Sequence, residues 1–507
     1  MAINNVLIAA FSKNIQLDME RQLMAPQSST SRVWSTQQDA IYSWFEGTLF
    51  PGRHCVVRAL AGTGKSTTIR EGVKRLCAGQ VRVQTLHSVG LGCVRRFRDN
   101  IKVEFTSTRA DSLVDKICGN RPPDAVKRLV SKLHTKGREI APHATKLGDL
   151  TSIAITFECE PDEQWAKAGF GLDYVETAAL QCMELASQVK SGDTIDGSDM
   201  IFLPVRNGWL TKQFDRVLVD EAQDMTVAQL EIAQGVLNDG GLMCVVGDNH
   251  QAIFGFRGAD SESLDRLKTE LNAVELGLTT TYRCGKAIVE LAQAYVPNFE
   301  AGPNNCEGEI LEMADIEGLT AAAQPGDFIL SRVNAPIVSI AMKLLRAGKR
   351  CHVAGRDIGK GLTTLIRKMR ARSVPELLSK IEAWATRENA RHQAQLAQAT
   401  NGRRDAIKAK MEAVTDQAEM MIALTEGAKS VTEVETRVEA LFTDDGLGAA
   451  GLVTLSSVHR AKGLEADRVF ILRDTLRDYN QEEKNIAYVA ITRAKKTLVW
   501  VGNKREQ

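Results

Sequence analysis

Residues 59–67 of the chain are ALAGTGKST; they follow the apolar run CVVRAL at 55–60 and overlap the helical pattern TTIREGVKRL at 67–76. A strand, a glycine-rich loop and a helix in this order are typical of a P-loop, in which backbone N–H groups hold phosphate oxygens. Lys65 is placed to reach the β- and γ-phosphates, and the Ser66 hydroxyl to ligate Mg²⁺. The strict pattern has glycine in place of Ala59, and a plain glycine turn is the alternative. We predict that the phosphates contact Ala61, Gly62, Thr63, Gly64, Lys65, Ser66 and Thr67.

A second apolar strand, RVLVDEA at 216–222, ends in two adjacent carboxylates. A P-loop enzyme needs this pair, with Asp220 in the Mg²⁺ shell and Glu221 orienting and deprotonating the attacking water. Four polar residues after a buried strand could also cap a helix. The presence of Lys65 upstream favours the catalytic interpretation.

The composition bounds the class of protein. The chain has 507 residues, or about three to four domains at roughly 150 residues each. Lys plus Arg is 64 and Asp plus Glu is 63, which excludes a histone-like basic coat and an acidic tail but not a local nucleic-acid cleft. The ten cysteines include no C-x-x-C pair, which favours a reducing, cytoplasmic location. No apolar run approaches the ~18 residues of a membrane span, so we expect no membrane partner.

Short apolar runs bounded by glycine, aspartate or charged residues recur along the chain, with helical stretches between them. Such runs predict buried parallel strands and an α/β fold of doubly wound sheets. They are residues 6–11, 55–60, 216–222, 242–248, 327–332, 453–458, 468–472 and 497–502. The stretch 385–440 is rich in Ala, Gln, Glu, Lys and Arg and predicts long, exposed helices.

Further motifs follow in a fixed order. They are TLHS at 85–88, DEAQD at 220–224, GDNHQAIFGFRGA at 247–259, TTYR at 280–283, VTLSSVHRAKGLE at 453–465 and YVAITRAK at 488–495. Together with GTGKS, this ordered set resembles superfamily 1 DNA helicases of the UvrD/Rep/PcrA type, from about residue 5 to 502. The resemblance implies an ATP hydrolase with ATP and Mg²⁺ as cofactors and two RecA-like domains, each carrying a mostly helical inserted subdomain.

The resemblance also implies domain boundaries. We expect motor domain 1 at 1–90 and 206–275, an accessory subdomain at 91–205, motor domain 2 at 276–332 and 449–507, and a helical accessory subdomain at 333–448.

Nucleotide contacts follow from the same resemblance. Arg283 and Arg493 would be arginine fingers on the γ-phosphate, which couples hydrolysis to closure of the cleft between the motor domains. Gln251 would sense the γ-phosphate, Tyr282 would stack on adenine and Glu465 would contact the ribose. A glutamine that contacts adenine is also expected, and the spacing S-x-x-Q-x-x-I favours Gln38 over its neighbour. A plain helix start is the alternative there.

Single-stranded nucleic acid is held by stacking on aromatic rings and by charge along the backbone. Phe256 is the best stacking candidate, with Arg257 beside it, and Phe11, His87 and His459 match positions where the family touches DNA. Each aromatic candidate could equally belong to the core. The stretch 343–372 holds ten Lys or Arg residues against one acid, which indicates a solvated helix face or a patch that follows phosphates.

The chain departs from the family in the order of one segment. The family has a strand ending in AFxK or TFTNKA between the P-loop helix and the TxHS segment, whereas here VLIAAFSKN stands at 6–14. We hypothesise that residues 2–23 are transposed from a point after Cys77 and that their strand still inserts beside the P-loop strand. The hypothesis fails if this strand lies outside the first sheet. An unrelated N-terminal strand is the alternative.

The sequence therefore predicts an ATP-dependent DNA helicase or single-stranded DNA translocase, and the resemblance implies 3′→5′ movement. The expected partners are single-stranded DNA, tailed duplex DNA and a nuclease or a repair or defence protein. One alternative is a motor subunit without autonomous unwinding, which works with a nuclease or displaces proteins. Another is an ATP-gated switch or binding module, which the intact hydrolytic set argues against.

Overall fold

The structure, a computed structural model of the chain, describes residues 5–10, 16–17, 19–20, 34–76, 79–106, 108–253, 263–398, 401–442 and 451–502. The chain divides into two compact units. The first unit comprises residues 1–60 and 64–278, and the second comprises residues 61–63 and 279–507. Each unit contains one six-stranded sheet in which neighbouring strands run parallel. The predicted α/β class with parallel sheets is confirmed.

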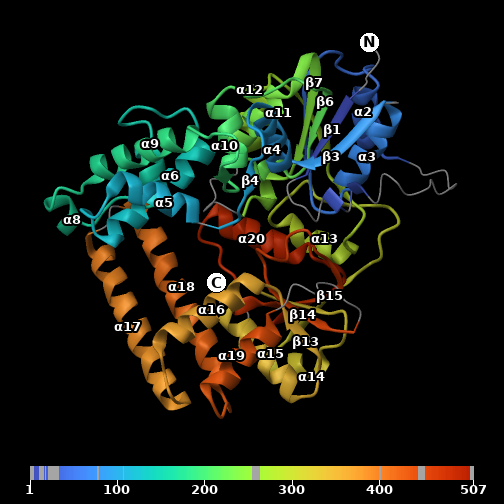
Figure 1. The fold of residues 1–507 in the computed structure, drawn as a ribbon. Helices are drawn as coiled ribbons and strands as arrows, with labels where there is room; N and C mark the ends of the chain where they lie inside the picture. Colours follow the sequence, from blue (N-terminus) through green and yellow to red (C-terminus); the bar gives the residue numbers. More distant parts are fainter. Residues whose placement is uncertain are drawn as a thin grey trace. The chain divides into compact units, whose positions relative to one another are not determined.

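The first sheet has the strand order β3-β1-β6-β7-β2-β8. Its strands are β1 (Asn5–Ala10), β2 (Cys55–Ala59), β3 (Gln80–Thr85), β6 (Phe214–Val219), β7 (Leu237–Gly247) and β8 (Val274–Leu278). Helices on one face are α2 (Thr36–Phe45) and α3 (Lys65–Arg75), and those on the other are α4 (Leu86–Phe97), α10 (Asp199–Arg206), α11 (Val227–Gly235) and α12 (Ser263–Glu270) (Figure 1). Because helices cover both faces, central strands need apolar side chains at successive positions, which explains their continuous apolar runs.

A helical region follows α4 in the first unit. It contains α5 (Thr108–Cys118), α6 (Asp124–Ile140), α7 (Thr151–Thr156), α8 (Glu163–Lys167), α9 (Leu172–Ser187) and the short parallel pair β4 (Lys102–Val103) and β5 (Thr194–Ile195). These helices share an apolar core of their own. Arg138 lies buried beside this core and is paired with Asp196 and Asp199 at 3.0 and 2.7 Å. Pairing offsets the cost of burying these charges.

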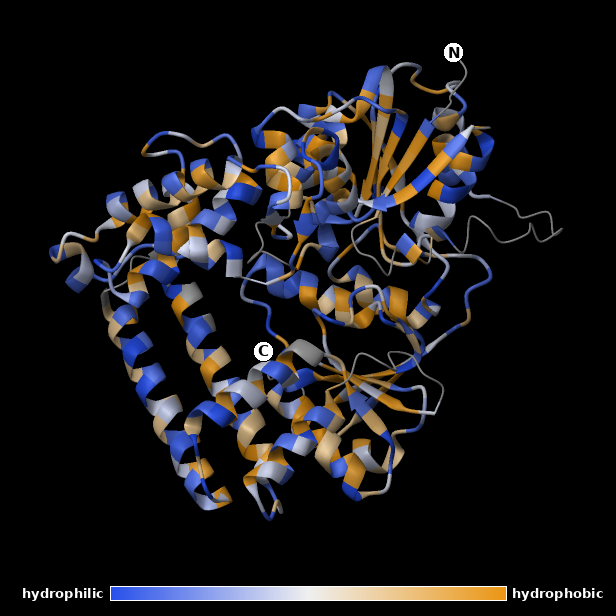
Figure 2. Ribbon diagram, in the orientation of Figure 1, coloured by the Kyte–Doolittle hydropathy of each residue, from blue (hydrophilic) through white to orange (hydrophobic). Residues whose placement is uncertain are grey.

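The second sheet has the strand order β11-β16-β15-β12-β14-β13. Its strands are β11 (Glu309–Met313), β12 (Phe328–Ser331), β13 (Cys351–Val353), β14 (Val453–Ser457), β15 (Ala466–Leu472) and β16 (Ala494–Val501). Four helices associated with the sheet are α13 (Lys286–Gln293), α14 (Ile316–Ala322), α15 (Ala335–Arg346) and α20 (Gln481–Ile491). A separate parallel pair consists of β9 (Thr280–Thr281) and β10 (Glu300–Ala301). Figure 2 shows the central strands of both large sheets as mostly hydrophobic.

Four further helices belong to the second unit: α16 (Arg356–Met369), α17 (Val374–Gln398), α18 (Asn401–Thr425) and α19 (Val431–Leu441). The long helices expected at 385–440 are therefore confirmed. Within the basic stretch 343–372, Lys343 pairs with Glu317 at 2.8 Å and Arg367 pairs with Glu435 at 2.9 Å. These ion pairs favour the solvated-face interpretation for both residues. Among the described residues, no helix combines the length and apolarity needed to cross a membrane.

Strand prediction succeeded in the sheet centres and failed at the edges. Each of the eight apolar runs overlaps a strand of one of the two large sheets. The four strands of these sheets that contain none of the eight runs are β3, β8, β11 and β13, and each is an edge strand. β11 has no fully buried residue, so its sequence, EILEM, carries no continuous apolar run. Edge strands bury less of each side chain, which weakens the pattern on which the prediction depends.

The N-terminal strand β1 lies inside the first sheet, as the transposition hypothesis requires. It pairs with β3 through Val6–Val81 and with β6 through Val6–Arg216. The expectation that it lies beside the P-loop strand was wrong, because the neighbours of β2 are β7 and β8. Side chains of β1 alternate between two cores, with Leu7 on one face and Ile8 on the other. The strand therefore holds both helical layers to the sheet.

We expect Ile8→Ala to lower the free energy of unfolding by about 2–5 kcal/mol, because a buried isoleucine leaves a cavity in a close-packed core. Thermal and urea unfolding followed by circular dichroism measure the change. The control is Val81→Ala on the edge strand β3, where the side chain is 38% exposed. That change is expected to cost less than about 1 kcal/mol. Equal effects of the two substitutions would contradict a central position for β1.

Candidate active site

The P-loop joins β2 to α3 through two glycines in the left-handed region. Gly62 has a φ of 69° and Gly64 has a φ of 83°. A side chain at either position would strain the backbone, so glycine is required for this turn. Gly64 is the N-cap of α3, and no side chain caps this helix end. The positive end of the helix dipole at Lys65 is therefore available to an anion.

Lys65 lies at the centre of a buried cluster of charges. Its Nζ lies 3.0 Å from Oε1 of Glu221, with the two side chains 12% and 17% exposed. Burial alone would lower the pKa of Lys65, but the carboxylates of Glu221, Asp220 and Asp248 outweigh burial and raise it. The ammonium is thus held in its charged form. A charged lysine at this point can bind phosphate oxygens.

Two oxygens at this edge suit a magnesium ion. The Ser66 hydroxyl and Oδ2 of Asp220 lie 3.3 Å apart. Burial, followed by the neighbouring carboxylate of Glu221, raises the pKa of Asp220 to about 6, so a cation here would relieve crowded negative charge. Mg²⁺ prefers one or two protein oxygens and completes its shell with waters and phosphates. No group of three or more His, Cys, Asp or Glu side chains that could hold a metal ion occurs in the described parts of the chain.

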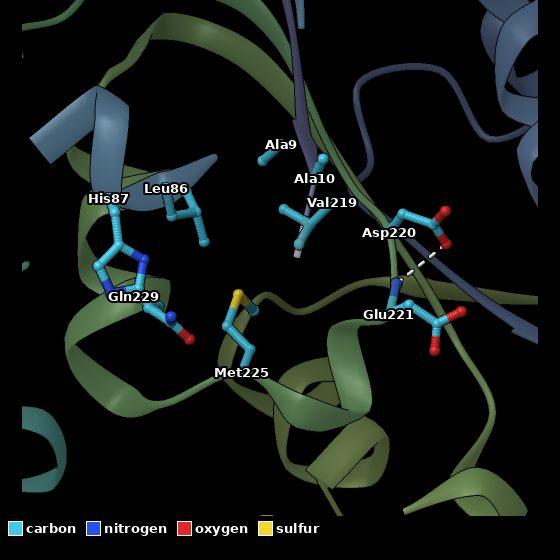
Figure 3. Close-up of a pocket in the computed structure, with 9 residues that line it drawn as sticks. All are labelled: Ala9, Ala10, Leu86, His87, Val219, Asp220, Glu221, Met225 and Gln229. Carbon is cyan, nitrogen blue, oxygen red and sulfur yellow. Dashed lines mark hydrogen bonds between the residues drawn. The ribbon is translucent and has the colours of Figure 1, made fainter. Parts of the chain in front are cut away.

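The backbone turns sharply between the two carboxylates. Glu221 has φ 54° and ψ 39°, a left-handed conformation that a residue with a side chain seldom adopts. Its N–H donates to Oδ1 of Asp220 at 2.9 Å, as the dashed line in Figure 3 marks. Strain of this kind persists where the surrounding structure over-determines it, commonly at functional sites. The turn allows Glu221 to pair with Lys65 while the adjacent Asp220 contacts Ser66.

Two residues that the sequence analysis did not select connect Glu221 to Gln251. Gln223 is fully buried; its Nε2 donates to Oε2 of Glu221 at 2.6 Å and its Oε1 accepts from the Asp248 N–H at 3.0 Å. Oδ2 of Asp248 in turn accepts from Nε2 of Gln251 at 2.7 Å. A Cβ at Gly247 would lie 2.5 Å from Oε1 of Gln223, so glycine is needed there. Polar residues at the ends of neighbouring strands were the signal that could have found both.

Gln38 serves the start of α2 and also faces the P-loop helix. Ser35 caps α2, and Gln38 completes the capping box by accepting from the Ser35 N–H at 3.1 Å. Its Nε2 donates to Oγ1 of Thr68 on α3 at 3.3 Å. Gln38 therefore does lie at a helix start, as the alternative interpretation predicted. This position does not exclude a nucleotide contact, because the same side chain lies 3.7 Å from the position of a Cβ at Gly64.

A small solvent-open hollow lies beside Asp220 and Glu221, at the ends of β1 and β6 (Figure 3). His87, in the first turn of α4, lines it together with Met225 and Gln229. Burial lowers the pKa of His87, although Glu139 acts in the opposite direction. The hollow places a residue predicted to contact DNA near Glu221. The predicted DNA contacts Phe11, Phe256 and Arg257 lie outside the described residues.

The second unit brings together Arg283, Glu465 and Arg493. Arg283 forms an ion pair with Glu465, and its Nη1 donates to the carbonyl of Thr492 at 3.5 Å. Arg493 is 1% exposed and donates from Nη1 to the carbonyl of Leu464 at 3.0 Å, one residue before Glu465. Three residues that are distant in sequence thus share one location within this unit.

Two predicted site residues of the second unit lie at its surface or near it. Tyr282 directly precedes Arg283 and is 46% exposed. Its exposed ring is accessible to a ligand. His459 follows β14 and is half-buried.

Parallel sheets, a P-loop and a neighbouring Asp–Glu pair define the chain as a P-loop nucleotide-binding protein of the α/β class. Residues 69–272 match the UvrD/REP helicase N-terminal domain, and residues 368–505 match the UvrD-like helicase C-terminal domain. The chain belongs to the UvrD-like helicase family. The resemblance stated from the motifs is thereby confirmed.

Several relatives are similar over about half of the chain. The ATP-dependent DNA helicase PcrA of Staphylococcus aureus is 24% identical over 255 residues, which are 48% of this chain and 33% of PcrA. The F-box DNA helicase 1 of Gallus gallus is 29% identical over 56% of this chain and 29% of its own length. The ATP-dependent DNA helicase UvrD2 of Mycobacterium bovis is 27% identical over 55% of this chain and 46% of its own length. The chain thus matches less than half the length of each relative.

We expect Gln223→Met to lower the free energy of unfolding by about 1–3 kcal/mol, because the Asp248 N–H would lose its buried acceptor. ATP turnover should also fall, since Glu221 would lose the donor that orients it. Differential scanning fluorimetry and an ATPase assay measure the two effects. The control is Gln234→Met on the exposed face of α11. Wild-type turnover in Gln223→Met would contradict an orienting role.

Proposed function

We propose that the chain is an ATP- and Mg²⁺-dependent DNA helicase or single-stranded DNA translocase that moves 3′→5′. The cluster of Lys65, Ser66, Asp220 and Glu221 at one edge of the first sheet carries the proposal. Membership of the UvrD-like family and the names of relatives, which are DNA helicases, support it.

We propose that the first unit binds the nucleotide and activates water. Lys65 would exchange its pairing with Glu221 for the β- and γ-phosphates, which frees the Glu221 carboxylate to accept a proton from water. Asp220 and Ser66 would hold Mg²⁺, which supplies charge neutralisation at the phosphates. Gln251 would respond to the γ-phosphate, and Gln38 would contact the adenine.

We propose that the second unit supplies the arginines. Arg283 and Arg493 would stabilise charge on the transferred γ-phosphate, Tyr282 would stack on adenine and Glu465 would bind the ribose. We propose the domain boundaries expected from the sequence. The motor domains are residues 1–90 with 206–275 and residues 276–332 with 449–507, and the helical accessory subdomains are residues 91–205 and 333–448. The apolar core around α6 supports the first accessory assignment, whereas helices α16–α19 share one core with the second sheet.

We propose single-stranded DNA and tailed duplex DNA as substrates. Contacts would come from His87 and His459, together with Phe11, Phe256 and Arg257, by stacking and by charge. A cytoplasmic location and a nuclease or repair partner remain predictions. Translocation without strand separation is the second candidate, because the same hydrolytic cluster serves either activity.

Lys65→Ala and Glu221→Gln should each reduce DNA-stimulated ATP hydrolysis by at least about a hundredfold. Removal of a transition-state donor or a general base typically costs this much. A coupled-enzyme ATPase assay with and without single-stranded DNA measures the loss. The matched control is Lys74→Ala in the last turn of the same helix, which should keep wild-type turnover. Retained turnover in either active-site variant would exclude the catalytic assignment.

Unwinding is expected on a duplex with a 3′ single-stranded tail and not on a 5′-tailed or blunt duplex. A fluorescence strand-separation assay measures it, with EDTA as the metal-free control. ATP hydrolysis that DNA stimulates without separating any duplex would support the translocase candidate instead. Unwinding from the 5′ tail alone would show that the implied polarity is wrong.

A further inference from the structure

The turn that carries Tyr282 and Arg283 is held by one side-chain amide. Nδ2 of Asn305 donates to the carbonyl of Thr281 at 2.9 Å and to the carbonyl of Cys284 at 2.8 Å. These carbonyls flank the two residues on either side. A single planar amide therefore fixes the distance between the two ends of the turn.

The segment that contains Asn305 is itself fixed to the same turn by backbone contacts. The Gly302 N–H donates to the Thr281 carbonyl at 2.9 Å, and the Asn305 N–H donates to the Gly302 carbonyl at 3.1 Å. The pair β9–β10 places Ala301 opposite Thr281. Asn305 thus approaches the turn from a segment that cannot shift independently of it.

The far side of the turn is fixed as well. The Gly285 N–H donates to the carbonyl of Lys495 at 2.8 Å. The backbones of Gly285 and Gly308 touch so closely that a Cβ on Gly285 would lie 2.6 Å from the Cα of Gly308. Between these fixed points, the carbonyls of Thr281 and Cys284 accept hydrogen bonds from the Asn305 amide.

The two residues on the turn need such support for different reasons. Tyr282 is 46% exposed, so burial does not place its ring. The ring lies close to the segment of Asn305, since a Cβ on Gly302 would lie 3.0 Å from Cδ1 of Tyr282 and 3.0 Å from Oδ1 of Asn305. The Arg283 side chain is held mainly through Glu465, whose own side chain is 39% exposed. The backbone of the turn is therefore the main determinant of where both side chains point.

We propose that Asn305 is a positioning residue that sets the geometry of Tyr282 and Arg283 toward the nucleotide. The inference rests on the proposed function of these two residues. A neutral amide with two N–H donors can bridge two carbonyls, whereas a carboxylate of the same shape would place negative oxygen against both. The position therefore requires an amide donor. Replacing Asn305 by aspartate tests this requirement with little change in side-chain shape.

Asn305→Asp should lower kcat for ATP hydrolysis by about 10- to 100-fold and raise the KM for ATP, because a displacement near 1 Å costs about that much in rate. The Kd for single-stranded DNA should stay within twofold of wild type. The matched control is Asn304→Asp, at the exposed neighbouring position, which should behave as wild type. Equal effects of the two substitutions would overturn the inference.

A double-mutant cycle with Arg283→Ala separates positioning from a general structural effect. If Asn305 acts through Arg283, the kcat of the double variant should lie no more than about twofold below the kcat of Arg283→Ala alone. Suppose that Arg283→Ala lowers kcat and that the loss of kcat in the double variant equals the product of the two single losses. That result would overturn the positioning inference and leave the proposed function intact. Wild-type turnover in Arg283→Ala would overturn the role of Arg283 and the inference with it.

Asn305→Ala keeps the inference testable if the aspartate variant does not fold. It removes both donors and adds no charge, so its kcat should lie between wild type and the level expected for Asn305→Asp. Thermal unfolding confirms that the variant is folded. A folded Asn305→Ala with wild-type kcat and KM would overturn the inference.

Discussion

The active edge of the first sheet depends on the balance of charge around Lys65. Three carboxylates, on Asp220, Glu221 and Asp248, raise the pKa of this buried ammonium, while burial raises the pKa of Asp220 and Asp248. Buried charges are tolerated where they are paired and hydrogen-bonded. An arriving phosphate would compete for Lys65 and leave the carboxylates without their cation. A divalent cation would restore the balance, which is consistent with the proposed joint binding of nucleotide and Mg²⁺.

The order of the strands in the sheet decides which residues meet at this edge. The order of the strands along the chain matters less. Asp220 and Asp248 follow β6 and β7, and Lys65 follows β2, which are three adjacent strands. Beyond β6 lies β1, which comes from the N-terminus and still ends at the hollow next to His87. Because parallel strands end at one edge, a segment can enter from another point in the chain and keep the site. The hypothesised transposition of residues 2–23 is therefore compatible with an intact sheet.

Features that depend on local pattern were predictable from the sequence, and features that depend on neighbours were not. The P-loop, the Asp220–Glu221 pair and the central strands have local signatures of glycine spacing or apolar runs. Asn305 has no such signature, and the polar run that contains Gln223 does not show which strand it faces, since both roles arise from the adjacency of β6 with β7 and of β9 with β10. The position of β1 was mispredicted for the same reason. Apolarity indicates that a strand is buried, but it does not identify its partners.

The two arginines of the second unit differ in how readily they can leave their present partners. Arg283 pairs with Glu465; the two side chains are 19% and 39% exposed, so solvent screens the pair in part. Arg493 is 1% exposed and donates to the carbonyls of Val489 and Leu464 at 2.9 and 3.0 Å. Each hydrogen bond from a charged donor is worth about 1.5–3 kcal/mol. Under the proposed function, Arg283 would therefore turn to a phosphate more readily than Arg493, which would engage one only if the backbone around it moves or if the phosphate comes to it.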